Sequence, residues 1–131
     1  MTGPSRVLVV EDHPLNRELA EAILQRAGYE VVGVEDGETA LDTVAAARPD
    51  VILLDVELPG ISGLEVTRRL KADPATRAIP VVVLTAYAMV GDEERARAAG
   101  CDEYVTKPIE RPKLLDAVAR ALAARPEEAA P

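Results

Sequence analysis

Five polar residues each stand close behind a short apolar run of the sequence, and their types suit one kind of chemistry. These residues are Glu11, Asp12, Asp55, Thr85 and Lys107. Carboxylates held side by side repel one another, and a hard divalent cation such as Mg²⁺, which takes oxygen ligands, relieves that repulsion. An aspartate in such a cluster can attack phosphorus and form an acyl phosphate, while a lysine and a hydroxyl stabilise the phosphoryl oxygens. The residue types therefore predict phosphoryl transfer with Asp55 as the nucleophile.

The elements that must position these residues follow from hydrophobic periodicity. Short apolar or β-branched runs predict strands at Val7–Val10, Val31–Val34, Val51–Leu54, Val81–Leu84 and Glu103–Val105. Helical spacing predicts helices from Pro14 to Gly28, from Gly37 to before Pro49, across Leu64–Leu70, across Gly91–Ala99 and across Leu114–Leu122. This alternation predicts an α/β fold with a doubly wound, five-stranded parallel sheet in the flavodoxin-like order 2-1-3-4-5 and five helices.

The predicted topology explains why residues so far apart in sequence should meet. In an open parallel sheet, ligands bind beyond the carboxyl ends of the strands, at the point where the strand order reverses. In this chain the reversal lies between the first and third strands, so Glu11, Asp12 and Asp55 are expected side by side. Thr85 and Lys107 follow the fourth and fifth strands and are expected at the same edge.

The first predicted helix has an apolar stripe that should face the core. Leu15, Leu19, Ala22 and Ile23 recur at positions i, i+4, i+7 and i+8. Residues at this spacing lie on one side of a helix. We therefore expect these four side chains to be buried against the sheet.

Length and composition limit the classes of protein. The 131 residues correspond to one domain, which we place at residues 6–124, followed by a disordered tail at 125–131. There are 23 acidic against 15 basic residues, which argues against partners that are nucleic acids or membrane surfaces. No apolar run has the roughly 20 residues of a membrane span, and the first residues do not resemble a signal peptide. The single cysteine, Cys101, excludes an internal disulfide and is compatible with a reducing cytoplasm.

Each candidate residue also has an ordinary structural explanation. Glu11 and Asp12 could favour the dipole of the following helix, Asp55 could be a turn residue, Thr85 could end a strand, and Lys107 could be a solvated surface base. It is improbable that all of them fall at strand carboxyl ends by accident.

Three other functions make different demands on the same positions. A haloacid-dehalogenase-type phosphatase needs a second aspartate two residues after the nucleophile, where this chain has Glu57. A flavodoxin-like FMN carrier needs a phosphate-binding loop after the first strand, where this chain has acidic residues. Bound FMN would make the purified protein yellow. A scaffold that works without phosphorylation would have no need for an intact Asp55, Thr85 and Lys107.

At these positions the chain resembles the receiver domains of response regulators, the CheY-like family. The matching segments are Val9–Asp12, Leu54–Asp55, Leu58–Gly60, Gly63, Leu84–Ala86 and Tyr104–Pro108. The resemblance covers roughly residues 6–124. The stretches 11–31 and 91–108 look particularly like stand-alone receivers of the DivK type and the receivers of hybrid histidine kinases.

The resemblance implies a role for each matching residue. Asp55 is implied as the acceptor of a phosphoryl group from a histidine kinase or phosphotransfer protein. The implied Mg²⁺ ligands are Glu11, Asp12, Asp55 and the backbone carbonyl of Glu57. Thr85 and Lys107 are implied to contact the phosphoryl group, and Thr85 with Tyr104 to form the switch. A cis peptide is implied between Lys107 and Pro108.

The resemblance also implies how the chain signals. It implies a stand-alone cytoplasmic response regulator of a two-component phosphorelay. Such a protein signals by altered binding to a downstream protein that the sequence does not identify. It is not a substrate-turnover enzyme, although it assists its own phosphorylation and dephosphorylation.

Overall fold

Strands and helices alternate along the whole of the described chain. The computed structural model describes residues 3–86 and 91–124. The strands are β1 (Arg6–Val10), β2 (Glu30–Val34), β3 (Val51–Asp55), β4 (Val81–Thr85) and β5 (Glu103–Thr106). The helices are α1 (Pro14–Arg26), α2 (Gly37–Ala46), α3 (Gly63–Ala72), α4 (Asp92–Ala99) and α5 (Arg111–Ala124). The tail predicted at 125–131 lies outside the described residues.

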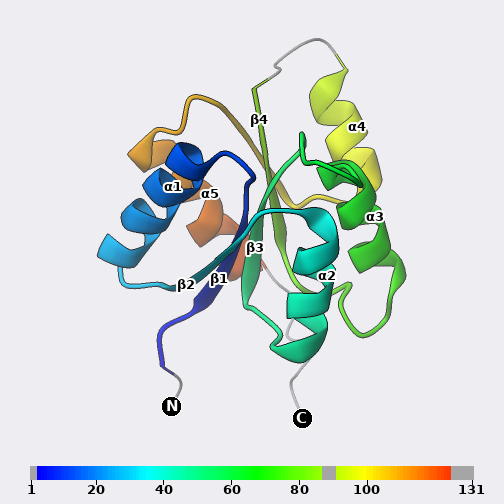
Figure 1. The fold of residues 1–131 in the computed structure, drawn as a ribbon, viewed down its shortest axis with the longest axis horizontal. Helices are drawn as coiled ribbons and strands as arrows, with labels where there is room; N and C mark the ends of the chain where they lie inside the picture. Colours follow the sequence, from blue (N-terminus) through cyan, green and yellow to red (C-terminus); the bar gives the residue numbers. More distant parts are fainter. Residues whose placement is uncertain (1–2, 87–90, 125–131) are drawn as a thin grey trace.

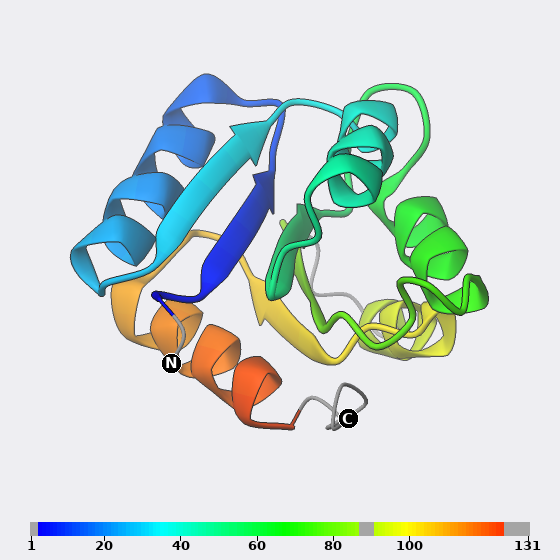
Figure 2. The ribbon, with the colours of Figure 1, turned by 90° about the horizontal axis from the view of Figure 1, so that it is seen from below.

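The strands form one parallel sheet in the order β2-β1-β3-β4-β5, as predicted. Figure 1 shows the sheet nearly edge-on, with α1 and α5 covering one face and α2, α3 and α4 covering the other. Figure 2, turned by 90°, shows the same two layers of helices. The predicted doubly wound α/β fold is confirmed.

The core is split by the sheet into two apolar layers. Every residue of β3 and β4 is buried, which a strand covered by helices on both faces requires. Side chains alternate along each strand, so Val7 and Val9 of β1 pack toward α1 and α5, whereas Leu8 and Val10 pack on the opposite face. A fully packed sheet centre of this kind gives the carboxyl ends of β1, β3 and β4 fixed positions.

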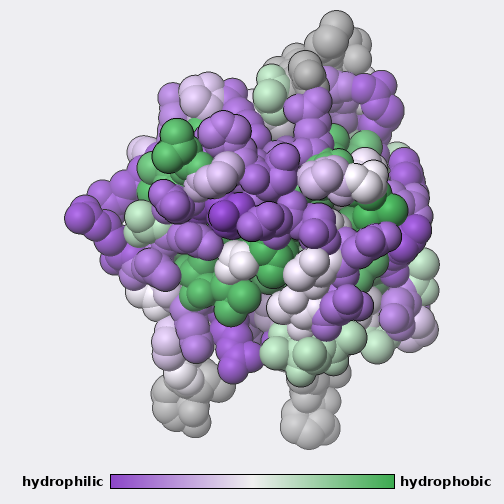
Figure 3. Space-filling model, in the orientation of Figure 1, coloured by the Kyte–Doolittle hydropathy of each residue, from purple (hydrophilic) through white to green (hydrophobic). Residues whose placement is uncertain are grey.

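Of the four α1 residues predicted to face the core, Ile23 is buried and the other three are exposed. The buried residues of α1 are Ala20, Ile23 and Leu24. Leu15 is 70% exposed and Leu19 45% exposed, and Ala22 is exposed as well. The helical period was correct but its phase was not, because β2 is an edge strand and α1 lays polar side chains across it. Figure 3 shows apolar surface over α1 and separately over β2, where Val32 is exposed.

Within residues 3–86 and 91–124, no helix combines the length and the apolar character needed to cross a bilayer. The longest helix, α5, has 14 residues, whereas a span needs about 20.

Candidate functional site

The carboxyl ends of β1 and β3 bring three acidic side chains together. Glu11, Asp12 and Asp55 each offer one carboxylate oxygen, and these oxygens lie within 4.8 Å of one another. Glu11 and Asp55 are buried, whereas Asp12 is exposed. The sequence prediction that the three acids meet is confirmed.

Asp55 lies at the end of β3, where its carboxylate is almost sealed from solvent. It is 3% exposed. Its Oδ1 accepts a hydrogen bond from the backbone N–H of Glu57 at 3.0 Å, and its Oδ2 accepts one from Lys107 Nζ at 3.0 Å. Burial raises the pKa of Asp55 from 3.8 to about 6, against the opposing effect of these two donors. Asp55 is therefore a carboxylate whose charge is costly to maintain without further positive charge.

Lys107 reaches across the site from the segment that follows β5. Its Nζ lies 3.0 Å from Asp55 Oδ2 and 3.1 Å from Glu11 Oε1. Burial opposes the ammonium charge, but contact with the two carboxylates outweighs it and raises the pKa of Lys107. The backbone N–H of Lys107 donates to the carbonyl oxygen of Thr85 at 2.7 Å, and the peptide bond to Pro108 is cis, as the resemblance implied.

Glu11 has a buried side-chain oxygen that accepts no hydrogen bond from the described part of the chain. The residue is 2% exposed, and its Oε2 accepts from the backbone N–H of His13 at 3.1 Å. Among residues 3–86 and 91–124 its Oε1 has no hydrogen-bond partner, although it forms an ion pair with Lys107 Nζ at 3.1 Å. The N-cap of α1 is His13, which makes no side-chain cap hydrogen bond. A buried carboxylate oxygen that has an ion pair but no hydrogen bond retains lone pairs with which it can bind a further cation.

The loop after β3 is held close to Asp55 by a glycine. A Cβ at Gly63 would collide with the backbone oxygen of Asp55. The backbone N–H of Gly63 donates to the carbonyl oxygen of Val56 at 2.8 Å, and the Ser62 side chain caps α3. Sequence reasoning identified Gly63 only as part of a turn and a motif, because spacing does not reveal which backbone atoms approach each other.

Thr85 and Tyr104 lie on the neighbouring strands β4 and β5. Thr85 is 3% exposed at the end of β4. Tyr104 is partly buried, which raises the pKa of its hydroxyl. Both residues line a cavity of about 290 Å³ together with Leu64 of α3 and Ala96 of α4. The two predicted switch residues therefore border one space beside Asp55.

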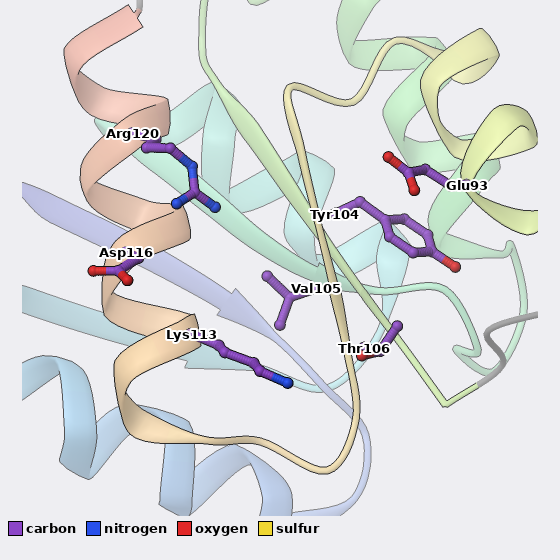
Figure 4. Close-up of a pocket in the computed structure, with 7 residues that line it drawn as sticks. All are labelled: Glu93, Tyr104, Val105, Thr106, Lys113, Asp116 and Arg120. Atoms are coloured by element: carbon purple, nitrogen blue, oxygen red, sulfur yellow. The ribbon is translucent and has the colours of Figure 1, made fainter.

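A second hollow of about 420 Å³ lies between α4, β5 and α5. Figure 4 shows Tyr104 extending from β5 toward Glu93 of α4, while α5 supplies the charged residues on the other side. These are Lys113, Asp116 and Arg120. Tyr104 borders both this hollow, the groove between α4, β5 and α5, and the cavity beside Thr85. A movement of its ring would therefore alter both spaces.

Arg17 also belongs to the site, although sequence reasoning did not select it. Its Nη1 donates to the backbone oxygen of Glu11 at 3.0 Å. No motif spacing connects an arginine in the first turns of a helix with a carbonyl six residues earlier.

Two other residues behave as ordinary structural residues: His13 is exposed, and Cys101 is buried with the pKa of its thiol raised to about 11.

Comparison with proteins of known sequence is consistent with this geometry. The family described as the response regulator receiver domain matches residues 7–119. The chain is 46% identical over 115 residues to the polar-differentiation response regulator DivK of Brucella anthropi, covering 88% of this chain and 94% of that protein. It is also 46% identical over 112 residues to DivK of Brucella melitensis, with 86% and 91% covered.

Solved structures lead to the same grouping. A putative response regulator from Chloroflexus aurantiacus superimposes with a TM-score of 0.89 at 35% identity, covering 92% of this chain and 98% of that chain. The receiver domain of a sensor histidine kinase from Pseudomonas aeruginosa gives 0.85 at 36% identity, covering 93% and 100%, and holds a magnesium ion in its active-site cleft. This chain therefore belongs to the response regulator receiver domain family.

Proposed function

We propose that residues 6–124 form a receiver domain that accepts a phosphoryl group on Asp55 in a Mg²⁺-dependent reaction. The observation that carries the proposal is the buried Asp55 carboxylate, 3.0 Å from Lys107 Nζ and clustered with Glu11 and Asp12. The donor is a histidine kinase or a histidine phosphotransfer protein.

The proposed reaction is a displacement at phosphorus. A carboxylate oxygen of Asp55 forms the new bond to phosphorus, the phosphorus–nitrogen bond of a phosphohistidine breaks, and its electron pair returns to the imidazole, which then takes up a proton. Lys107 neutralises charge on the transferred group, and the Thr85 hydroxyl donates to one of its oxygens. This chemistry depends on positioning and on the neutralisation of charge. It modifies Asp55 of the protein itself, so no independent substrate is turned over.

The metal proposal is supported by the donor set of the site. Glu11, Asp12 and Asp55 provide carboxylate oxygens. Glu11 Oε1 is buried and, within the described ranges, has the Lys107 ion pair but no hydrogen bond. We propose that these three residues and the backbone carbonyl of Glu57 hold Mg²⁺ together with water. When bound, the ion supplies positive charge to the transferred phosphoryl group.

The proposed switch uses the space that Thr85 and Tyr104 share. A phosphoryl oxygen on Asp55 draws the Thr85 hydroxyl toward it, and the Tyr104 ring turns into the space that this opens. The groove between α4, β5 and α5 then changes shape and alters binding to a downstream protein. The size of such a population shift is limited by the difference in phosphoryl contacts between the two states. Coupling free energies of this kind are typically about 1–3 kcal/mol.

The upstream partner has a candidate contact surface on α1. Leu15 and Leu19 are exposed on the helix that begins beside the acidic cluster. Exposed apolar side chains beside a functional site indicate a protein contact. We propose that the phosphodonor packs an apolar helical surface against them. A donor of this kind acts in the cytoplasm, which is where we place the protein.

The decisive experiment is phosphorylation by acetyl phosphate with and without Mg²⁺, followed by intact mass. We expect one added phosphoryl group with Mg²⁺ and none in EDTA. Asp55→Asn should abolish labelling, because a carboxamide is a poor nucleophile, and Asp12→Ala should weaken the Mg²⁺ dependence. Labelling of the Asp55→Asn variant to the wild-type level would exclude Asp55 as the acceptor.

A further inference from the structure

Arg17 places a second positive charge at the backbone carbonyl of Glu11, one of the residues of the acidic cluster. Its Nη1 donates to the backbone oxygen of Glu11 at 3.0 Å, and its Nη2 lies 3.9 Å from Glu35 Oε2. The peptide it binds is the one that joins Glu11 to Asp12. The side chain of Arg17 is only 18% exposed, although it projects from a surface helix.

The position of Arg17 is built into the edge of the sheet. A Cβ on Gly33 of β2 would lie 3.2 Å from Arg17 Cδ and would collide with the carboxylate of Glu21. Because Gly33 has no side chain, the side chains of Glu21 and Arg17 lie directly against the backbone of β2. Packing of this kind holds the guanidinium at the Glu11 carbonyl.

This charge has opposite effects on the two states of the site. Without a metal ion, a cation near Glu11, Asp12 and Asp55 reduces the repulsion among the carboxylates. When a divalent cation occupies the same cluster, the guanidinium repels it. At physiological salt the screening length is about 8 Å. A guanidinium bound to the Glu11 carbonyl is therefore only partly screened from charge at the Glu11 and Asp12 side chains.

We propose that Arg17 is a positioning residue that acts as a resident counter-cation: it stabilises the metal-free site and weakens its affinity for Mg²⁺. This inference rests on the proposed function, because it requires the acidic cluster to be the Mg²⁺ site. It adds to that function a residue that sets the Mg²⁺ concentration at which the site fills. A competing explanation is that Arg17 only holds the loop in shape, in which case its loss would weaken Mg²⁺ binding.

Two substitutions at the same position separate charge from shape. Arg17→Met keeps most of the apolar arm and removes the charge, whereas Arg17→Lys keeps the charge and removes the guanidinium. Arg26→Met is the matched control, because Arg26 is exposed in the last turn of α1, roughly 13 Å further along the helix axis. It removes the same unit of charge far from the cluster.

Each protein is titrated with MgCl₂, and the dissociation constant is taken from calorimetry and from the rise in melting temperature. We expect Arg17→Met to bind Mg²⁺ about three- to tenfold more tightly than wild type and to melt at a lower temperature in EDTA. Arg17→Lys and Arg26→Met should bind within about twofold of wild type. The gain in Arg17→Met should shrink as salt is raised.

The outcomes separate this inference from the proposed function. Equal or weaker Mg²⁺ binding by Arg17→Met, with wild type still responding to Mg²⁺, overturns the inference and leaves the proposed site intact. An Arg17→Lys variant that behaves like Arg17→Met also overturns it, because charge would then not be the cause. A wild-type protein that ignores Mg²⁺ removes the metal site itself, and the inference falls with it.

Discussion

Replacing Asp55 by asparagine should make the metal-free protein more stable at neutral pH. The carboxylate is 3% exposed, and its pKa rises from 3.8 to about 6 in the folded chain. Above pH 6 the folded protein therefore carries a charge that the fold disfavours. Asparagine is neutral and keeps an oxygen that can accept from the Glu57 N–H. The variant thus removes the cost of the charge while retaining that hydrogen bond.

The size of the effect follows from the pKa shift. A rise from 3.8 to about 6 corresponds to an upper limit of about 3 kcal/mol, and solvent at the open rim of the site screens part of it. We expect Asp55→Asn to raise the free energy of unfolding by about 1–2 kcal/mol at pH 7.5 in EDTA.

The pH dependence gives the sign of the effect. Asp55 has a raised folded pKa, so the folded state binds more protons than the unfolded state between pH 3.8 and about 6. The wild type loses stability as the pH rises through that window, and the advantage of the variant grows in step. At pH 5 the advantage should be about half of its value at pH 7.5. Saturating Mg²⁺ should reduce it, because the ion stabilises only the ionised site.

Urea unfolding followed by circular dichroism measures these differences. Asp42→Asn is the matched control, because Asp42 is exposed on α2 and the change removes the same charge. It should leave the free energy of unfolding within about 0.5 kcal/mol of wild type. An Asp55→Asn variant that is no more stable than wild type at pH 7.5, or whose advantage is independent of pH, would refute the reasoning about the buried charge.

Three further predictions concern neighbouring parts of the site. Lys107→Met should abolish or strongly slow the labelling of Asp55 by acetyl phosphate in an intact-mass assay, because two buried carboxylates lose their common cation. The control is Lys113→Met, which replaces an exposed lysine on α5 and should leave labelling normal. Tyr104→Ala should still accept the phosphoryl group but lose most of the gain in partner affinity with a beryllofluoride mimic; an equal gain in both proteins would assign the signal to another route. Gly63→Ala should lower the free energy of unfolding by at least about 2 kcal/mol, because its Cβ collides with the backbone oxygen of Asp55, and a near-neutral result in urea would contradict that contact.

The sequence determined the parts of this protein that depend on local pattern and on the order of elements. Apolar runs alternating with helical stretches are sufficient to predict a parallel sheet, because handed crossovers leave few topologies. The position of Asp55 at a strand end, and its meeting with Glu11 and Asp12, follow from that topology, since the carboxyl ends of parallel strands share one edge.

The tertiary structure alone decided which side chains face inward and which backbone atoms touch. The period of α1 was readable, but its phase depended on the edge strand beneath it, so Leu15 and Leu19 lie outside while Ala20 and Leu24 lie inside. The approach of Gly63 to the Asp55 carbonyl, and of Arg17 to the Glu11 carbonyl, likewise arises from packing between elements. Sequence spacing describes order within one element, whereas contacts of this kind depend on how neighbouring elements are placed against each other.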